Sequence, residues 1–418
     1  MPNLWSHLTL PPSDQGCFDF VIIGAGIVGL TTAYELKARF PSARIAVLEK
    51  EPDVGRHASG RNSGVLHSGI YYGAETLKAR VCAKGSARMV AFAEEYGIPC
   101  RRSGKVIIAT SEQDLPTIER LLQNARDNGI RAERLDEQGV RAIEPHAAPY
   151  QAGIWSPDTA VIDSRAVLDR LREQLAQCGV QCYFNQHVTG VAQDGRYLRT
   201  TSGRYSTDYV FNCAGANADR IARQFGAGGD YALVPFKGLY YKLRDAKRHL
   251  VHGNIYPVPD VSLPFLGVHL TRVITGEVYA GPTAIPALGR ENYGMVAGLR
   301  AGEAAVIGWQ LVRLYLRDES NFRRLVHTEM RKYRKLNFLE SVRRLVPEIE
   351  EDDLVRAEKV GIRPQLVNVR TNRLEMDFVV ETASRSLHVL NAISPAFTSS
   401  FAFAELLVDR YVATAGTS

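Results

Sequence analysis

The sequence predicts an α/β protein in which a Rossmann-type domain, assembled from discontinuous segments, is joined to an α+β domain with an antiparallel sheet. Near the N-terminus a strand, a glycine-rich turn, a helix and a second strand follow in register. From about residue 233 to 283 apolar and polar residues alternate, with prolines at the turns, which is typical of antiparallel strands. After residue 350 the pattern returns to strands and ends in a helix at 400–412. A chain of 418 residues has room for two or three domains of ordinary size.

The first of these units reads FDFVIIGAGIVGLTTAYELKARFPSARIAVLEK. Residues 18–23 form a predicted strand, residues 28–39 a predicted helix, and the next strand ends in Glu49. Gly24, Gly26 and Gly29 supply a tight turn, a close approach to a diphosphate and a close contact between helix and sheet. Glu49 follows Gly29 by twenty residues, the spacing at which an acid binds a ribose. The unit predicts a dinucleotide site with the diphosphate at the helix N-terminus.

Later segments favour FAD over NAD(P) as the dinucleotide. No second G-x-G-x-x-G follows a strand, and there is no redox C-x-x-C pair, which argues against the two-nucleotide reductases. Residues 209–218, YVFNCAGANA, form an apolar strand that runs into Ala214 and Gly215, where the backbone can pass closely under a ligand. A second run of small residues, RNSGVLHSGIYYG at 61–73, encloses His67. One N-terminal binding motif followed by such a corridor points to FAD.

The remaining pattern divides the chain into two domains. Helices are predicted at 74–97, 115–129 and 164–178, the last with Ser164 as its cap, and a strand at 105–110. We expect residues 18–105, 157–222 and 350–418 to form the FAD-binding domain. Residues 106–156 and 223–349 then form the substrate-binding domain. Residues 1–17 lack the features of a signal or transit peptide and are expected to be a short leader.

Cysteine usage and hydropathy predict a cytoplasmic protein. No apolar run approaches the ~20 residues that cross a bilayer. The six cysteines show no metal-ligand spacing, so we expect reduced thiols and no metal site. Cys178 and Cys182 could form a disulfide, but packing is favoured.

The segment 313–344 carries ten Lys and Arg against four Asp and Glu. We favour a pair of amphipathic helices with solvated basic faces. The alternative is a surface that touches anionic lipid at the inner face of a membrane, or an acidic partner. Nucleic acid is excluded because no nucleic-acid-binding signature accompanies the charge.

With these motifs in hand, the chain resembles the L-2-hydroxyglutarate dehydrogenase/oxidase family within the D-amino-acid oxidase superfamily. The resemblance rests on DFVIIGAGIVGL, NSGVLHSGIYY, IYPVPD, PFLGVHLTR, EVYAGPTA, GIRPQ, MDF and NAISPAFTSS, which occur in the family's order from residue 18 to 412. It implies FAD-dependent oxidation of L-2-hydroxyglutarate to 2-oxoglutarate, with electrons passed to a quinone or similar acceptor. The chain departs from the family pattern at Arg61, Leu239, Thr283 and Pro364, which bears on the exact hydroxy acid.

The resemblance also implies which residues contact the cofactor. The implied FAD contacts are Gly24, Gly26, Ile27, Gly29, Glu49, Lys50, Arg61, Asn62, Ser63, Gly64, Val188, Ala214, Gly215, Ser394, Pro395 and Thr398.

Oxidation of a secondary alcohol needs a base for the hydroxyl proton, and His67 is the candidate. The alternative is a histidine that merely hydrogen-bonds the flavin or the backbone. A dicarboxylate also needs cations, and Arg363 is the candidate for one carboxylate because its fork matches it, although a surface ion pair would use the same residue type. Further substrate contacts are expected among Tyr71, Lys237, Tyr256, His269, Arg272 and Gln365, with Arg61 a further candidate cation.

Two other functions are compatible with the residues. A related flavoenzyme could oxidise glycine, sarcosine or glycerol 3-phosphate, and an amine oxidase would need only one cation for one carboxylate. An FAD-bound scaffold that recruits a partner without turnover is the other. The scaffold is less favoured, because it does not require a base beside the flavin.

Overall fold

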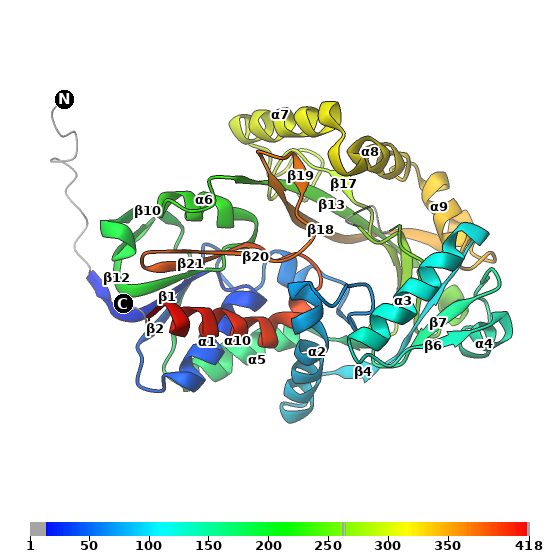
Figure 1. The fold of residues 1–418 in the computed structure, drawn as a ribbon, viewed down its shortest axis with the longest axis horizontal. Coiled ribbons are helices and arrows are strands. Elements are labelled where there is room, and N and C mark those ends of the chain that lie inside the picture. The colour runs from blue at the N-terminus through cyan, green and yellow to red at the C-terminus, as the bar shows by residue number, and fades with distance from the viewer. Residues whose placement is uncertain (1–13, 261–262, 264, 416–418) are drawn as a thin grey trace.

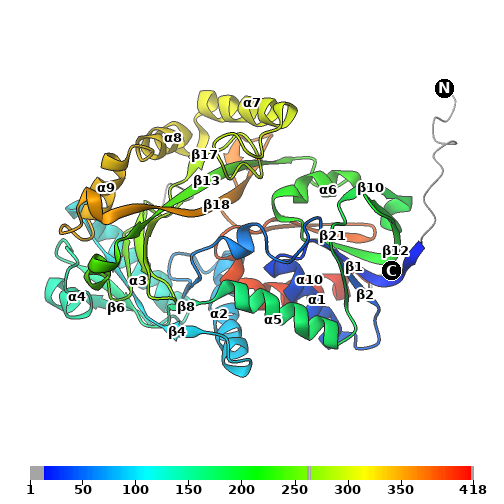
Figure 2. The same ribbon diagram turned by 180° about the vertical axis from the view of Figure 1, so that it is seen from behind.

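The computed structural model describes residues 14–260, 263 and 265–415, so most of the expected leader lies outside the described part of the chain. Figures 1 and 2 show two lobes, each built on a large sheet, with both ends of the described chain, residues 14 and 415, in the same lobe. The α/β class expected from the sequence is confirmed. None of the helices in the described part is long and apolar enough to cross a bilayer.

The lobe that holds both ends contains an eight-stranded sheet. Its centre is β1 (Asp14–Ile23), which pairs in parallel with β2 (Ile45–Leu48) and β12 (Arg204–Asn212). Strands buried on both faces read as unbroken apolar runs, as VII and IAVL do here. The other strands are β9 (Gln181–Tyr183), β10 (Val188–Ala192), β11 (Tyr197–Thr200), β20 (Val379–Ala383) and β21 (Ser386–Asn391).

Helices from distant parts of the chain cover this sheet. The glycine-rich turn leads into α1 (Ile27–Arg39), which packs against α10 (Ala396–Ala415) and α5 (Ser164–Gln177). The predicted cap of α5 is wrong by one residue. Asp163 is the cap, because its carboxylate accepts hydrogen bonds from the N–H groups of Arg165 and Ala166. The helices α2 (Leu77–Glu95) and α6 (Ala218–Gln224) complete the lobe.

The second lobe is built on a ten-stranded sheet, largely antiparallel as expected. The long strands β13 (Tyr231–Leu243) and β18 (Leu354–Asn368) pair antiparallel along most of their length. The other strands are β5 (Lys105–Ile108), β6 (Glu133–Leu135), β7 (Gly153–Ser156), β14 (Asn254–Pro257), β15 (His269–Arg272), β16 (Val278–Gly281), β17 (Ile285–Pro286) and β19 (Arg373–Leu374).

The helices of this lobe are α3 (Leu115–Asp127), α4 (Glu137–Ile143), α7 (Ala301–Arg317), α8 (Phe322–Arg331) and α9 (Lys335–Arg343). Figure 1 shows α7, α8 and α9 on the outer side of the lobe. Between the lobes lies a small sheet of β3 (Val65–Leu66), β8 (Ala160–Ile162) and β4 (Cys100–Arg102).

Sheet membership differs from the predicted domain boundaries in one place. The sequence prediction assigns residues 350–418 to the FAD-binding domain, whereas β18 and β19 pair in the ten-stranded sheet. Alternation of apolar and polar residues identifies a strand but not the sheet that it joins. The difference matters because Arg363 lies on β18, in the sheet opposite the glycine-rich turn.

Candidate active site

A cavity of about 730 Å³ is lined by residues of both lobes. Its walls at one end are Gly24, Glu49 and Gly215, which follow or end strands of the eight-stranded sheet. At the other end they include His269 and Arg363 of the ten-stranded sheet. The volume is in the range of ligand-binding pockets.

The end of the cavity near β1 has the features that a dinucleotide needs. Gly24 has a φ of +105°, and a Cβ there would lie 2.6 Å from the carbonyl oxygen of Cys213. A Cβ on Gly29 would lie 1.9 Å from the carbonyl oxygen of Gly24, so α1 could not approach the turn with any other residue. The buried carboxylate of Glu49 accepts from the N–H groups of Ala25 (2.7 Å) and Glu51 (3.0 Å). This fixes an acid where a ribose would lie.

The N-terminus of α1 also opens onto the cavity. Gly26 is the cap residue and has no side chain of its own to offer, although the N–H of Ile27 donates to Oγ of Ser59 at 2.9 Å. An anionic diphosphate is the natural partner of such a helix end. The residues at this end of the cavity therefore fit FAD.

Most of the predicted cofactor residues line this one cavity. Two do not reach it: Gly29 makes the close helix contact, and Gly64, with a φ of +72°, packs against the backbone of Ile162. Those that line it are Gly24, Gly26, Ile27, Glu49, Lys50, Arg61, Asn62, Ser63, Val188, Ala214, Gly215, Ser394, Pro395 and Thr398.

His67 lies in the cavity wall directly after β3. Its backbone N–H donates to Oγ1 of Thr398 at 3.2 Å, and its carbonyl accepts from the Cys82 thiol at 3.4 Å. Within the described residues, its buried Nδ1 has no hydrogen-bond partner. Burial, together with the charge of Lys105, holds the pKa of His67 well below its ordinary value. The imidazole is therefore neutral at neutral pH and can accept a proton.

Two further predicted residues, Tyr256 and His269, stand beside His67. Their rings stack with centroids 3.9 Å apart, and the Tyr256 ring lies edge-on to His67 at 6.5 Å. Nδ1 of His269 donates to the carbonyl of Gly267 at 2.9 Å, which leaves Nε2 as the acceptor nitrogen. Burial lowers the pKa of His269 to about 3, so this ring stays neutral.

Arg363 reaches the same part of the cavity from β18, and its guanidinium lies 4.9 Å from the ring centroid of Phe265. The stacked ring holds the fork in one plane while its edge stays available to a carboxylate. Because His67 follows β3 of the small sheet and Arg363 lies on β18 of the ten-stranded sheet, only the tertiary structure brings them together.

Four predicted substrate residues do not line the cavity. The ammonium of Lys237 binds Oδ1 of Asn292 (2.9 Å) and the carbonyl of Gly294 (2.7 Å). Gln365 is fully buried and donates to the carbonyl of Glu375 at 2.6 Å. Arg272 donates to the carbonyl of Val251 at 3.3 Å. Tyr71 lies behind the cavity wall, in the cluster of Ile70 and Ile118.

Sequence reasoning missed residues 288–300, a segment of the second lobe that lines the cavity and is here called the strap. Its Arg290 is buried and forms a two-pronged ion pair with the buried Asp219, one contact of which is 2.8 Å, and it also donates to the carbonyl of Ala216. Arg290 and Asp219 lie 71 residues apart in the chain, so no local pattern could have paired them.

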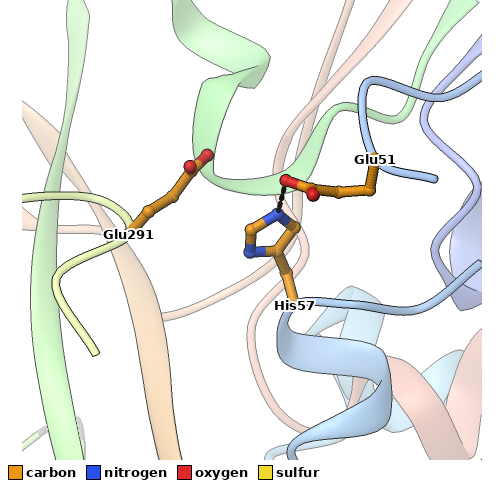
Figure 3. A group of neighbouring side chains, drawn as sticks. All are labelled: Glu51, His57 and Glu291. Carbon is orange, nitrogen blue, oxygen red and sulfur yellow. Dashed lines mark hydrogen bonds and ion pairs between the residues drawn. The ribbon is translucent and has the colours of Figure 1, made fainter. Parts of the chain in front are cut away.

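Glu291 of the strap meets Glu51 and His57 of the lobe with the eight-stranded sheet. Figure 3 shows these three side chains converging. Three acceptors so close together suggest a metal site, but the Lys50 ammonium is bonded to all three, at 2.9 Å from His57 Nε2 and from Glu291 Oε1. The cluster therefore already holds a cation of its own. Tyr293 adds a hydrogen bond to His57 at 2.7 Å.

A second residue outside the sequence prediction is Lys105, at the start of β5. Its side chain is fully buried beside Tyr71 and Tyr256. A lysine that opens an otherwise apolar strand, KVII, was the signal available in the sequence.

Comparison with known proteins agrees with this geometry. Residues 19–410 match the FAD-dependent oxidoreductase family. The chain is 37% identical to the L-2-hydroxyglutarate dehydrogenase of Indibacter alkaliphilus, over 92% of this chain and 96% of that one. It is 37% identical to the human mitochondrial L-2-hydroxyglutarate dehydrogenase, over 94% and 88% of the two chains. Among solved structures, the L-α-glycerophosphate oxidase of Mycoplasma pneumoniae with FAD bound superimposes with a TM-score of 0.74 at 20% identity, over 94% of each chain.

Proposed function

Because the chain belongs to the family of FAD-dependent oxidoreductases, we propose that it oxidises L-2-hydroxyglutarate to 2-oxoglutarate. The observation that carries this proposal is the identity of 37% to L-2-hydroxyglutarate dehydrogenases along nearly the whole chain. The geometry supports it, since a neutral imidazole and a guanidinium line one cavity with the cofactor residues. A hydroxy acid needs both groups.

The protein's part in the reaction is to hold the substrate and to move one proton. FAD, when bound, accepts the hydride from the substrate's C2. Arg363 pairs with one carboxylate and thereby fixes where C2 lies. The imidazole of His67 takes the hydroxyl proton as the C–O bond becomes a carbonyl. Tyr256 and His269 close the wall behind the substrate and exclude water from it.

The test is anaerobic reduction of the bound flavin, followed by absorbance, with a panel of L- and D-2-hydroxy acids. Rapid bleaching by L-2-hydroxyglutarate alone is the expected result. Glycine, sarcosine and glycerol 3-phosphate belong in the panel because related flavoenzymes oxidise such substrates. Faster bleaching by any of these three would replace the proposed substrate.

For the electrons we propose a quinone as acceptor, met at the cytoplasmic face of a membrane. The supporting observation is the outer face of α7 and the strap, where large apolar side chains are exposed: Met295, Val296, Val306, Trp309, Val312 and Leu316. Arg300 and Arg317 are exposed beside them. Apolar side chains flanked by cations are typical of a surface that lies on anionic lipid.

This surface only partly coincides with the segment 313–344 that the sequence suggested. Several cations of that segment have internal partners: Arg313 donates to the carbonyl of Val369, Arg324 pairs with Asp260 and Lys332 with Glu329. The proposed membrane surface therefore centres on α7 rather than on α8 and α9.

A further inference from the structure

The proposed substrate carries two carboxylates, and the cavity must offset both charges. Arg363 supplies one cation. Two of the other cations suggested by the sequence, Lys237 and Arg272, point to backbone and amide partners outside the cavity. The third, Arg61, lines the cavity, but its guanidinium lies over the Tyr293 ring at 4.1 Å and donates to the carbonyls of Arg56 (3.0 Å) and Val360 (3.4 Å). The site therefore lacks an assigned partner for the second carboxylate.

Lys105 is a buried cation that could offset the charge of the second carboxylate. It is 0% exposed, and within the described residues its Nζ has no hydrogen-bond partner. Nζ lies 4.4 Å from the ring centroid of Tyr71 and 5.1 Å from that of Tyr256, the ring that lies edge-on to His67. A buried ammonium without a counter-ion is costly, and a structural role alone would favour an apolar residue here.

We propose that Lys105 is the positioning residue for the second carboxylate: from behind the wall formed by Tyr256 and His67, its ammonium offsets the second negative charge of the substrate. This inference rests on the proposed function, because only a dianionic substrate needs it. Lys105 does not line the cavity, so it acts through the rings and the local electric field and does not touch the reacting atoms.

Burial makes this charge responsive to the substrate. It lowers the pKa of Lys105 to about 7. At pH 8 only about one Lys105 in ten is then charged in the free site. A bound dianion raises the pKa, so binding draws one proton from the buffer. The titratable groups that interact with Lys105 do not take up this proton between pH 6 and 8, because burial keeps each of them neutral. These groups are two imidazoles, one thiol and two phenols: His67, His269, Cys82, Tyr71 and Tyr256.

The test is isothermal titration of the FAD-bound enzyme with glutarate, which has the carbon chain and both carboxylates but no hydroxyl to oxidise. Repeating the titration in buffers of different ionisation enthalpy gives the number of protons taken up. We expect uptake of close to one proton at pH 8 that falls toward zero at pH 6. Lys105→Met should abolish this uptake and reduce the preference for glutarate over pentanoate by about 10- to 100-fold.

Lys78→Met is the matched control. Lys78 is also a buried lysine, with a pKa lowered to about 8, but it donates to the carbonyl of Met376. Uptake that is lost in Lys78→Met but kept in Lys105→Met would overturn the inference. The inference would also be overturned if the wild-type enzyme bound glutarate tightly at pH 8 without proton uptake. This measurement does not depend on the folding of any variant. A wild type that binds pentanoate as well as glutarate contradicts the proposed substrate class itself, which separates the two failures.

Discussion

Burial and the charge of the neighbouring Lys105 both lower the pKa of His67. Both disfavour the charged form, so the proposed base is neutral over a wide pH range. Since a lowered pKa means that protonation requires more acid, we expect the acid limb of the kcat/KM profile to lie below pH 6.5. His67→Gln should slow flavin reduction roughly 10²- to 10⁴-fold with FAD still bound.

The rate of anaerobic flavin reduction in a stopped-flow instrument measures this effect directly. The surface residue His146, paired with Glu348, gives the control variant His146→Gln, which should behave as wild type. A His67→Gln enzyme that reduces its flavin at nearly the wild-type rate would remove His67 from the role of base.

Variants of Arg363 test the proposal that this residue binds the first carboxylate. Arg363→Met should raise the KM for L-2-hydroxyglutarate and the Kd for 2-oxoglutarate by about 10- to 100-fold, because a charge-assisted pair is lost. Arg363→Lys keeps the charge but not the fork and should fall between. Arg356, exposed on the same strand, supplies the control Arg356→Met. Equal KM values for the Arg363 and Arg356 variants would show that the carboxylate binds elsewhere.

Among the elements, the strap is held to the lobe of the eight-stranded sheet by the buried Arg290, besides the contacts of Glu291 and Tyr293. Burial alone would raise the pKa of Asp219, but the hydrogen bond and charge of Arg290 outweigh it and lower this pKa. Arg290→Met would leave the buried carboxylate with only Arg223 at 3.6 Å and the N–H of Leu233 at 3.3 Å. Removal of the main partner of a buried charge typically costs about 3–5 kcal/mol. We expect FAD to dissociate faster and the melting temperature to fall.

Release of flavin fluorescence gives the FAD dissociation rate. In the double variant Arg290→Met with Asp219→Asn the unpaired charge is gone, so part of the stability should return while FAD still dissociates faster. Arg134→Met, which removes the exposed partner of Glu119 away from the cavity, is the control. An unchanged dissociation rate in Arg290→Met would mean that the strap does not retain the cofactor.

The helix α7 carries the prediction about the membrane. Trp309 is 68% and Val306 60% exposed, and with their exposed neighbours they form an apolar patch of the kind that marks an interaction surface. We expect Val306→Asp with Trp309→Asp to abolish co-sedimentation with phosphatidylglycerol vesicles. Val412→Asp, at an exposed apolar position of α10, should leave it unchanged. Binding that survives the α7 variant, or that the wild type lacks, would contradict the proposed surface.

For the whole molecule, the cavity is lined by residues of both lobes, so the cofactor should stabilise both lobes together. At FAD concentrations about 100-fold above its Kd the expected gain is about 2.7 kcal/mol. We expect added FAD to raise the melting temperature of cofactor-free protein in a single transition. Riboflavin, which lacks the diphosphate that α1 would bind, should raise it less, and an equal effect of the two would place the main contacts elsewhere.

Much of the FAD end could be predicted because its signals are local. Gly24, Gly29 and Glu49 lie in one continuous strand–turn–helix–strand unit, and each glycine is required by a backbone contact within it or by the adjacent strand. The substrate end could not be predicted in the same way. Lys237 and Arg363 both lie on strands of one sheet, yet only Arg363 lines the cavity, because the face that a strand residue occupies depends on register with its partner strand.

The sequence by itself determined the fold class, the FAD-binding unit and the residue types for oxidising a hydroxy acid, since periodicity and glycine spacing act over short stretches of chain. Only the tertiary structure decided which cations line the cavity, that β18 joins the opposite lobe, and that Arg290 meets Asp219. These depend on contacts between residues far apart in the chain. Burial, which moves the pKa values of His67 and Lys105, likewise exists only once those contacts have formed.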